Sequence, residues 1–251
     1  MNTLLHWLAL ARLAHRGSTD ALPWYGVLAT ALLGPLFYVL YFFFVRLGSI
    51  APDQAPRTLL TALLLMPVGA SVFGIATLFG RLRNWGVLRQ ILISRYGLFS
   101  FALAQTLNAT AISASVNLIV LVPAGLFLLG GDPAMLASFW VASIIASFAL
   151  AMFGLACAMF ILTMRDHLMV TNVLFFVVML TSGVVDDLTG LPDRLMWINP
   201  VRPLVDWIGD TSFDGGWDHR IAASAAMAMV YLGIAKAVEL VQMRRIALVD
   251  I

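Results

Sequence analysis

The sequence predicts an all-α membrane protein with six transmembrane helices, because it is poor in charge and contains long uncharged runs. Hydrophobic residues make up 61% of the 251 residues and charged residues only 11%. A typical soluble domain is about 25% charged, so lipid is the better solvent for this chain. We expect one transmembrane domain over residues 1–251 and no separate catalytic domain. The net charge of +2 is too small to indicate nucleic acid as a partner.

Six uncharged runs define the expected spans. They cover residues 21–45, 58–80, 96–131, 133–164, 168–185 and 221–235. A helix needs about 20 apolar residues to cross the hydrocarbon. The last run reaches this length only if Lys236 and Glu239 are included near its end. A lysine there can extend to the interface, and a glutamate three residues later can lie beside it. We therefore place five spans within 21–185 and the sixth within 221–251.

The third run is too long for one perpendicular crossing, yet no charged or Pro-Gly turn divides it. As a helix, residues 96–131 would extend about 54 Å. We predict one long helix with an end outside the hydrocarbon. The sequence GGDP at 130–133 supplies the turn into the fourth span.

The basic residues indicate the orientation of the chain. Six spans place both termini on one side, and the loops on that side hold ten of the fifteen Lys and Arg residues. These ten are Arg12, Arg16, Arg81, Arg83, Arg89, Arg95, Arg165, Lys236, Arg244 and Arg245. Positive charge is retained on the cytoplasmic side, which predicts a multi-pass protein of the cytoplasmic (inner) membrane with both termini in the cytoplasm.

Two segments on the cytoplasmic side are predicted to lie flat on the membrane. Residues 1–20 form a moderately amphipathic helix, with Arg12 and Arg16 opposite the apolar residues. The loop 81–95, RLRNWGVLRQILISR, repeats apolar residues such as Trp85 at helical spacing, with arginines elsewhere around the turn. Headgroup anchoring explains these arginines, and a docking surface for a cytoplasmic partner is the alternative.

Motifs for chemistry on a substrate are absent from the sequence. It contains no GxxxxGK[ST] nucleotide loop, no HExxH or paired CxxC, and no GxSxG, and its four histidines are scattered. Ionisable residues are also missing from the span centres, where an ion-coupled carrier needs them. If the protein moves a cargo, we expect the energy to come from a partner.

The third span carries a polar stripe. Gln105, Asn108, Ala111 and Ser115 follow 3-3-4 spacing and share one side of a helix. In lipid, such groups must face protein or a cavity. The stripe therefore either lines a translocation path or holds helices together through hydrogen bonds.

Aspartates recur at every fourth residue between the last two spans, at Asp206, Asp210, Asp214 and Asp218. A cation site is conceivable, but Gly209 and other glycines would break a helix here, and the DxDxDG form of a calcium loop is missing. We interpret this segment as a solvated acidic loop. Trp197 and Trp207 are of the type found at the membrane interface.

The segment LTSGVVDDLTGLPDRLMWINPVRPLVDWI, residues 180–208, resembles the type-2 ABC transporter permease family. The resemblance lies in a span that ends in Ser-Gly (182–183), then Leu-Pro (191–192), and then Asn-Pro (199–200) before the last span. It implies six spans, an N-terminal interfacial helix at 1–20, and an outer re-entrant helical hairpin within 186–220. It also implies dimerisation, with a second copy or a paralogue, and separate ABC ATP-binding subunits in two copies.

The resemblance assigns expected roles to residues of this chain. The outer gate or re-entrant element would contain Gly183, Pro192, Asn199, Pro200 and Arg202. The path would contain Gln105, Asn108 and Ser115, and the ATPase would dock on Arg12, Arg16, Arg81, Arg83, Trp85 and Arg89. The chain departs from the family in two places. Asp186 and Asp187 replace an apolar or Phe-Pro element, and Arg202 lies closer to Asn-Pro than the usual arginine.

The expected function is a permease subunit of an ATP-driven exporter for an amphiphilic or hydrophobic cargo such as a drug, lipid, glycan or peptide. The chain itself would hold no metal or cofactor, since ATP and Mg²⁺ would bind to the partner. One alternative is a membrane enzyme acting on a lipid or isoprenoid substrate, for which Asp186, Asp187 and Asp193 are the candidate residues. A noncatalytic scaffold within a larger complex is another.

Overall fold

The computed structural model describes residues 64, 91, 97–128, 133–161, 173–174, 177–178, 180–182, 197–210 and 217–249. Within these residues the chain is helical and contains no strand, which confirms the all-α prediction. Two of the described helices, Pro133–Phe160 and His219–Val241, are long and apolar enough to cross a membrane. The interfacial helix at 1–20 and nearly all of the first two spans lie outside the described residues. The count of six spans stays a prediction.

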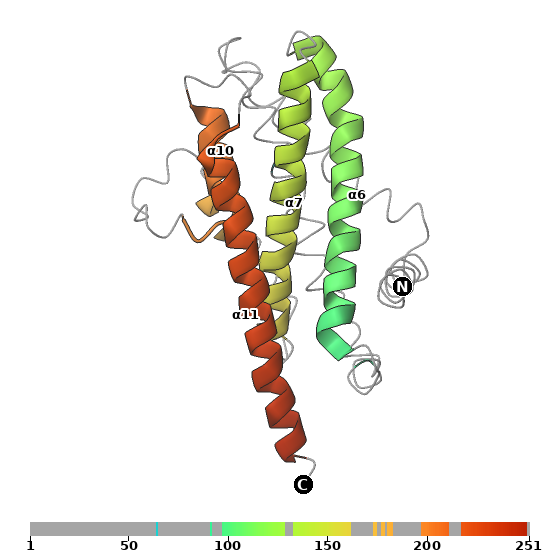
Figure 1. Ribbon diagram of the computed structural model, residues 1–251, viewed down its shortest axis with the longest axis vertical. Helices are drawn as coiled ribbons and strands as arrows, with labels where there is room; N and C mark the ends of the chain where they lie inside the picture. The colour runs from blue at the N-terminus through green and yellow to red at the C-terminus, as the bar shows by residue number, and fades with distance from the viewer. Residues whose placement is uncertain are drawn as a thin grey trace.

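Helices α6 (Gly97–Leu128) and α7 (Pro133–Ile161) form an antiparallel hairpin (Figure 1). The third uncharged run therefore forms one long helix, and the chain reverses direction between Leu128 and Pro133, as predicted. Gly97, the first residue of α6, has a φ of 70°. Only glycine adopts this left-handed conformation without strain, so Gly97 sets the direction in which the chain enters α6.

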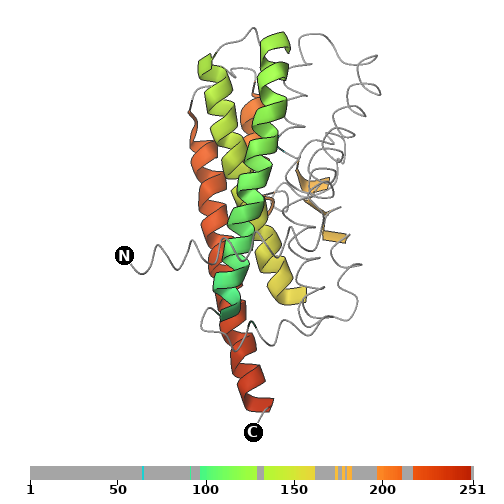
Figure 2. The same cartoon turned by 90° about the vertical axis from the view of Figure 1, so that its right-hand side faces the viewer.

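Helix α11 (His219–Val249) runs parallel to α7 and antiparallel to α6 (Figures 1 and 2). It continues without a break through Lys236 and Glu239, as the prediction for the sixth span requires. In both views its C-terminal turns extend beyond the neighbouring ends of α6 and α7.

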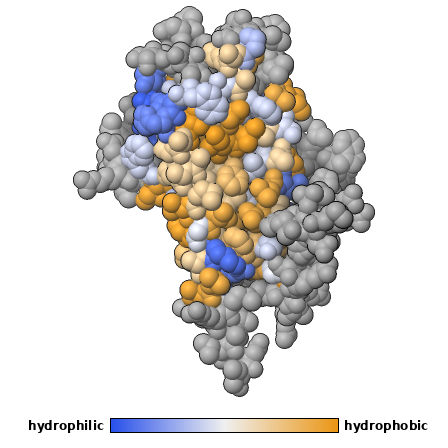
Figure 3. Space-filling view, viewed as in Figure 1, coloured by the Kyte–Doolittle hydropathy of each residue, from blue (hydrophilic) through white to orange (hydrophobic). Residues whose placement is uncertain are grey.

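Helix α7 is the centre of the described bundle, and 72% of its apolar span is buried, whereas only 22% of that of α11 is. Small residues make close packing possible, and Ala142, Ser143, Ala146 and Ser147 are fully buried. The two serine hydroxyls donate hydrogen bonds to carbonyls of their own helix. Figure 3 shows a broad apolar surface over the middle of the bundle and polar atoms near its ends, the pattern expected of a chain surrounded by lipid.

A short helix, α10 (Arg202–Gly209), lies beside the first turns of α11 (Figures 1 and 2). We call this end of the bundle, where α6 ends and α7 and α11 begin, the α10 end. One side of α10 belongs to a hydrophobic cluster in which Leu204, Ile208, Phe139 and Leu150 are fully buried. Trp207 is 4% exposed and lies in this core rather than at the interface, contrary to our expectation.

Candidate functional site

The Asn-Pro sequence forms a buried turn that leads into α10. The Asn199 side chain is 3% exposed, and its Nδ2 donates to the Val178 carbonyl at 2.7 Å and to Thr181 Oγ1 at 3.2 Å. Its Oδ1 accepts a hydrogen bond from the Val201 backbone N–H at 3.0 Å. Asparagine is suited to this position because one amide group can both donate and accept. Asn199 thus joins the turn to Val178 and Thr181, near the end of the predicted fifth span.

Two hydroxyl groups of α11 hold the same turn from the other side. Ser224 Oγ donates to the Pro200 carbonyl at 2.6 Å, and Tyr231 donates its phenolic O–H to the Ile198 carbonyl. Such carbonyls have no helical partner where the chain turns, and leaving them unpaired in an apolar bundle is costly. The turn is therefore hydrogen-bonded to the fifth span and to α11 at once.

Helix α10 starts directly from this turn. The Arg202 N–H donates to the Asn199 carbonyl at 3.1 Å, and the Leu204 and Val205 N–H groups donate to the Val201 carbonyl, each at 3.0 Å. Pro203 stands in the first turn of the helix, where a missing N–H costs nothing. Because Asn199 fixes the turn, it also fixes the direction in which α10 enters the core.

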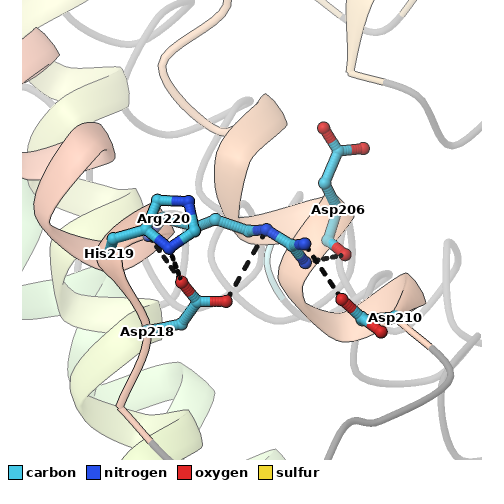
Figure 4. A network of polar contacts seen from close by, with 5 residues as sticks. All are labelled: Asp206, Asp210, Asp218, His219 and Arg220. Carbon is cyan, nitrogen blue, oxygen red and sulfur yellow. Dashed lines mark hydrogen bonds and ion pairs between the residues drawn. The ribbon is translucent and has the colours of Figure 1, made fainter.

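Arg220 holds the polar side of α10 (Figure 4). Arg220, at the start of α11, donates from Nη1 to the Asp206 carbonyl and from Nη2 to Asp210 Oδ2, both at 2.9 Å. Its Nε lies 3.6 Å from Asp218 Oδ2. A guanidinium at the C-terminus of a helix satisfies free carbonyls and interacts favourably with the helix dipole. Arg220 therefore closes the end of α10 and joins it to α11.

The described aspartates are each paired, which corrects our interpretation of this segment as a solvated acidic loop. Asp206 pairs with Arg202 at 2.9 Å, and Asp210 pairs with Arg220. Asp218 precedes α11, accepts a hydrogen bond from the Arg220 backbone N–H at 3.2 Å, and lies against His219. It thereby caps the helix. Among the described residues, no group of three His, Cys, Asp or Glu could hold a metal ion.

The residues of the polar stripe predicted on α6 differ in how deeply they are buried. Gln105 is 4% exposed, Asn108 is half-buried, and Ser115 is exposed and donates to the Ala111 carbonyl at 2.8 Å. The stripe therefore passes from the interior of the bundle to its surface. Its role as a path lining stays a prediction.

A second polar stripe on α6, which the sequence reading missed, is buried along its whole length. Thr106 and Thr110 donate their hydroxyls to carbonyls one turn earlier in the helix. Ser113 is 6% and Asn117 1% exposed. Among the residues that the structure describes, Ser113 Oγ and Asn117 Nδ2 have no hydrogen-bond partner. These four residues follow 4-3-4 spacing, so the sequence alone could have indicated that they share one side of a helix.

Several predicted site residues lie outside the described residues. These are Gly183 and Pro192 of the outer element and the docking residues Arg12, Arg16, Arg81, Arg83, Trp85 and Arg89. Of the predicted outer element, the structure brings together Asn199, Pro200 and Arg202 at the entry to α10.

An all-helical chain with apolar spans and a buried Asn-Pro turn before its last helix has the features of a transport protein's membrane subunit. The family model for ABC-2 type transporters matches residues 12–211, about four fifths of the chain. The chain therefore belongs to the ABC-2 type transporter family, and it is a membrane-embedded permease subunit of an ABC transporter. The match contains the Asn199 turn and α10. No characterised protein and no solved structure gives a significant match.

Proposed function

We propose that this chain forms the membrane path of an ATP-driven exporter that moves an amphiphilic or hydrophobic cargo outward across the cytoplasmic membrane. Two permease chains would form the path, and two copies of an ABC ATPase would bind on the cytoplasmic side. In this arrangement the α10 end faces outward. ATP and Mg²⁺ would bind to the ATPase chains.

The observation that carries the proposal is the buried Asn199 turn within the matched part of the chain. A helix that enters an apolar bundle and ends inside it must satisfy its free backbone groups with protein partners. Asn199, Ser224 and Arg220 supply these partners at both ends of α10. Helix α10 is thus suited to close the outer end of a path.

The distribution of charge supports an external energy source. Helices α6 and α7 contain no charged residue from Gly97 to Leu128 or from Pro133 to Ile161. An ion-coupled carrier needs ionisable groups at such depths to bind and release the coupling ion. Hydrolysis of ATP by a separate chain removes this need.

Affinity purification of the chain from its native membrane tests the proposal. We expect an ABC ATPase to co-purify in stoichiometric amount. The combined variant Arg81→Gln, Arg83→Gln, Arg89→Gln should lose the ATPase. The matched control is Arg46→Gln, Arg57→Gln, Arg194→Gln, which removes the same charge from the opposite side. If wild-type chain binds no ATPase in any condition that preserves the native complex, the proposal is wrong.

The enzyme alternative requires acidic groups that are free to act on a substrate. Its candidate residues Asp186, Asp187 and Asp193 lie outside the described residues. The described carboxylates of Asp206, Asp210 and Asp218 form ion pairs with arginines and do not support it. If the combined substitution of Asp186, Asp187 and Asp193 abolished turnover of a lipid or isoprenoid substrate without changing ATPase binding, this alternative would be favoured.

A further inference from the structure

Glu239 is a buried carboxylate near the end of α11 that lies away from α10. It is 7% exposed, although the surrounding residues Leu240 and Val241 are each 54% exposed. A buried carboxylate in an apolar bundle needs hydrogen bonds and a counter-charge to offset its desolvation. The partners of Glu239 therefore show what this residue holds together.

The first partner is the start of α6. The Phe99 backbone N–H donates to Glu239 Oε1 at 2.9 Å. The first N–H groups of a helix have no partner within that helix, and negative charge there interacts favourably with the helix dipole. The first turn of α6 contains no acidic residue of its own. Glu239 thus caps α6 from a helix 140 residues away in the sequence.

The second partner is Lys236, one turn earlier in α11. Its ammonium group pairs with Glu239 Oε2 and lies 4.7 Å from the centre of the Phe99 ring. A cation at this distance is attracted to the face of an aromatic ring. Phe99 is therefore held by its backbone through Glu239 and by its ring through Lys236. We call these three residues the Glu239 clamp.

Helix α11 connects the Glu239 clamp to α10. The clamp lies toward the C-terminus of α11, and α10 contacts its first turns. Phe99 follows the loop 81–95, the predicted docking surface for the ATPase, by only a few residues. At the other end of α11, Ser224 and Arg220 hold the Asn199 turn and α10. Between these ends α11 is one unbroken helix. Movement of the chain at the start of α6 can therefore reach α10 through α11.

We propose that Glu239 is a positioning residue for transport, which couples movement at the start of α6 to α10 by way of α11. The inference rests on the proposed function, because it takes the ATPase as the source of that movement. The inference adds a route within this chain. Through α11, ATP binding on the cytoplasmic side would open or close the α10 end on the outer side.

The test uses the chain in complex with its ATPase in lipid nanodiscs. In a Cys157→Ala background, an environment-sensitive fluorophore is attached to Leu107→Cys on α6 or to Trp197→Cys at the turn. Both positions are exposed, at 45% and 54%. With native Glu239, addition of Mg-ATP should change the signal of both labels. With Glu239→Ala, the label on α6 should still respond, and the response at the turn should fall by about tenfold.

Two further variants keep the result interpretable. Glu239→Gln retains an acceptor for the Phe99 N–H but loses the charge, so its response at the turn should fall less. Val241→Ala is the control, because it truncates a side chain on the same helix that is 54% exposed and lies outside the clamp. It should leave both responses unchanged.

The outcomes separate the inference from the function on which it rests. A full response at the turn with Glu239→Ala overturns the coupling role. Loss of both responses with Glu239→Ala and Glu239→Gln alike also overturns it, since the clamp would then serve only the general structure. Absence of any ATP response in the complex with native Glu239 contradicts the proposed function itself.

Discussion

The Asn199 turn and the centre of α6 are two buried polar regions of one apolar bundle, and they differ in how their hydrogen bonds are satisfied. At the turn, the side-chain amide of Asn199 and the carbonyls of Ile198 and Pro200 have partners on two neighbouring segments. In α6, the donors of Ser113 and Asn117 have none among the described residues.

The difference indicates which region serves as a scaffold. A buried donor without a partner costs about 1–3 kcal/mol, whereas a paired one contributes about 1 kcal/mol. The turn therefore stabilises the described conformation, and the centre of α6 opposes it. Unpaired buried groups are the kind of feature found where a protein must change its shape or its contacts. The two regions contain matched residues, a serine and an asparagine each, so the contrast can be tested directly.

The largest effect is expected for Asn199→Ala, compared with Asn117→Ala. Loss of Asn199 removes its hydrogen bonds to the Val178 carbonyl and Thr181 Oγ1 and leaves the Val201 N–H without the Asn199 acceptor, which should lower the free energy of unfolding by about 2–4 kcal/mol. The melting temperature in detergent should fall by about 5–15 °C. Asn117→Ala removes an equal volume and breaks no hydrogen bond of its Nδ2, so it should cost clearly less. Equal losses would contradict the comparison.

Arg220→Gln should have the next largest effect, about 1 kcal/mol, because the arginine is partly exposed and water screens its ion pairs. Loss of its bond to the Asp206 carbonyl frees the end of α10. Hydrogen exchange should accelerate at residues 206–210 while the centre of α7 stays protected. Arg202→Gln is the control, since its pair with Asp206 lies within one helix and is worth less than about 0.5 kcal/mol.

The serine pair gives a difference of similar size. Ser224→Ala leaves the Pro200 carbonyl without its partner and should destabilise the chain by about 1 kcal/mol. Ser113→Ala removes a hydroxyl that has no partner among the described residues and should leave the melting temperature unchanged or slightly raised. If Ser113→Ala were the more destabilising substitution, the Ser113 hydroxyl would be hydrogen-bonded in the native protein, and the contrast between the two regions would be wrong.

The smallest effect on stability is expected for Asn117→Leu, and its sign is the informative result. An apolar residue in place of an amide whose Nδ2 has no partner among the described residues should leave the melting temperature unchanged or raise it by about 2–4 °C. If this side of α6 meets the cargo during transport, the same variant should lower the transport rate of the complex. A stable variant with unchanged transport would remove Asn117 from the path.

The positions of the helices could be predicted from the sequence because the responsible signals are local. The GGDP turn separated α6 from α7, and the neighbouring charges of Lys236 and Glu239 proved compatible with one continuous α11. The pair Arg202 and Asp206, four residues apart, was readable in the same way.

The contacts that build the site could not be predicted, because they join residues far apart in the sequence. Asn199 meets Val178, and Glu239 meets Phe99, and no local pattern specifies either pair. The aspartates were misread for the same reason, since Arg220 comes 10 residues after Asp210 and reaches it only once α11 is in place. Helical spacing identified polar stripes on α6, but burial depends on which neighbouring helices cover each side.

The partners of the Asn199 turn also determine the order in which the chain can assemble during synthesis. Val178 and Thr181 precede the turn and are available when Asn199 leaves the ribosome. Ser224 and Tyr231 belong to α11, the last helix to enter the membrane. Until that helix is inserted, the carbonyls of Ile198 and Pro200 have no hydroxyl to bind. The α10 end therefore cannot close during biogenesis until the last helix is in place.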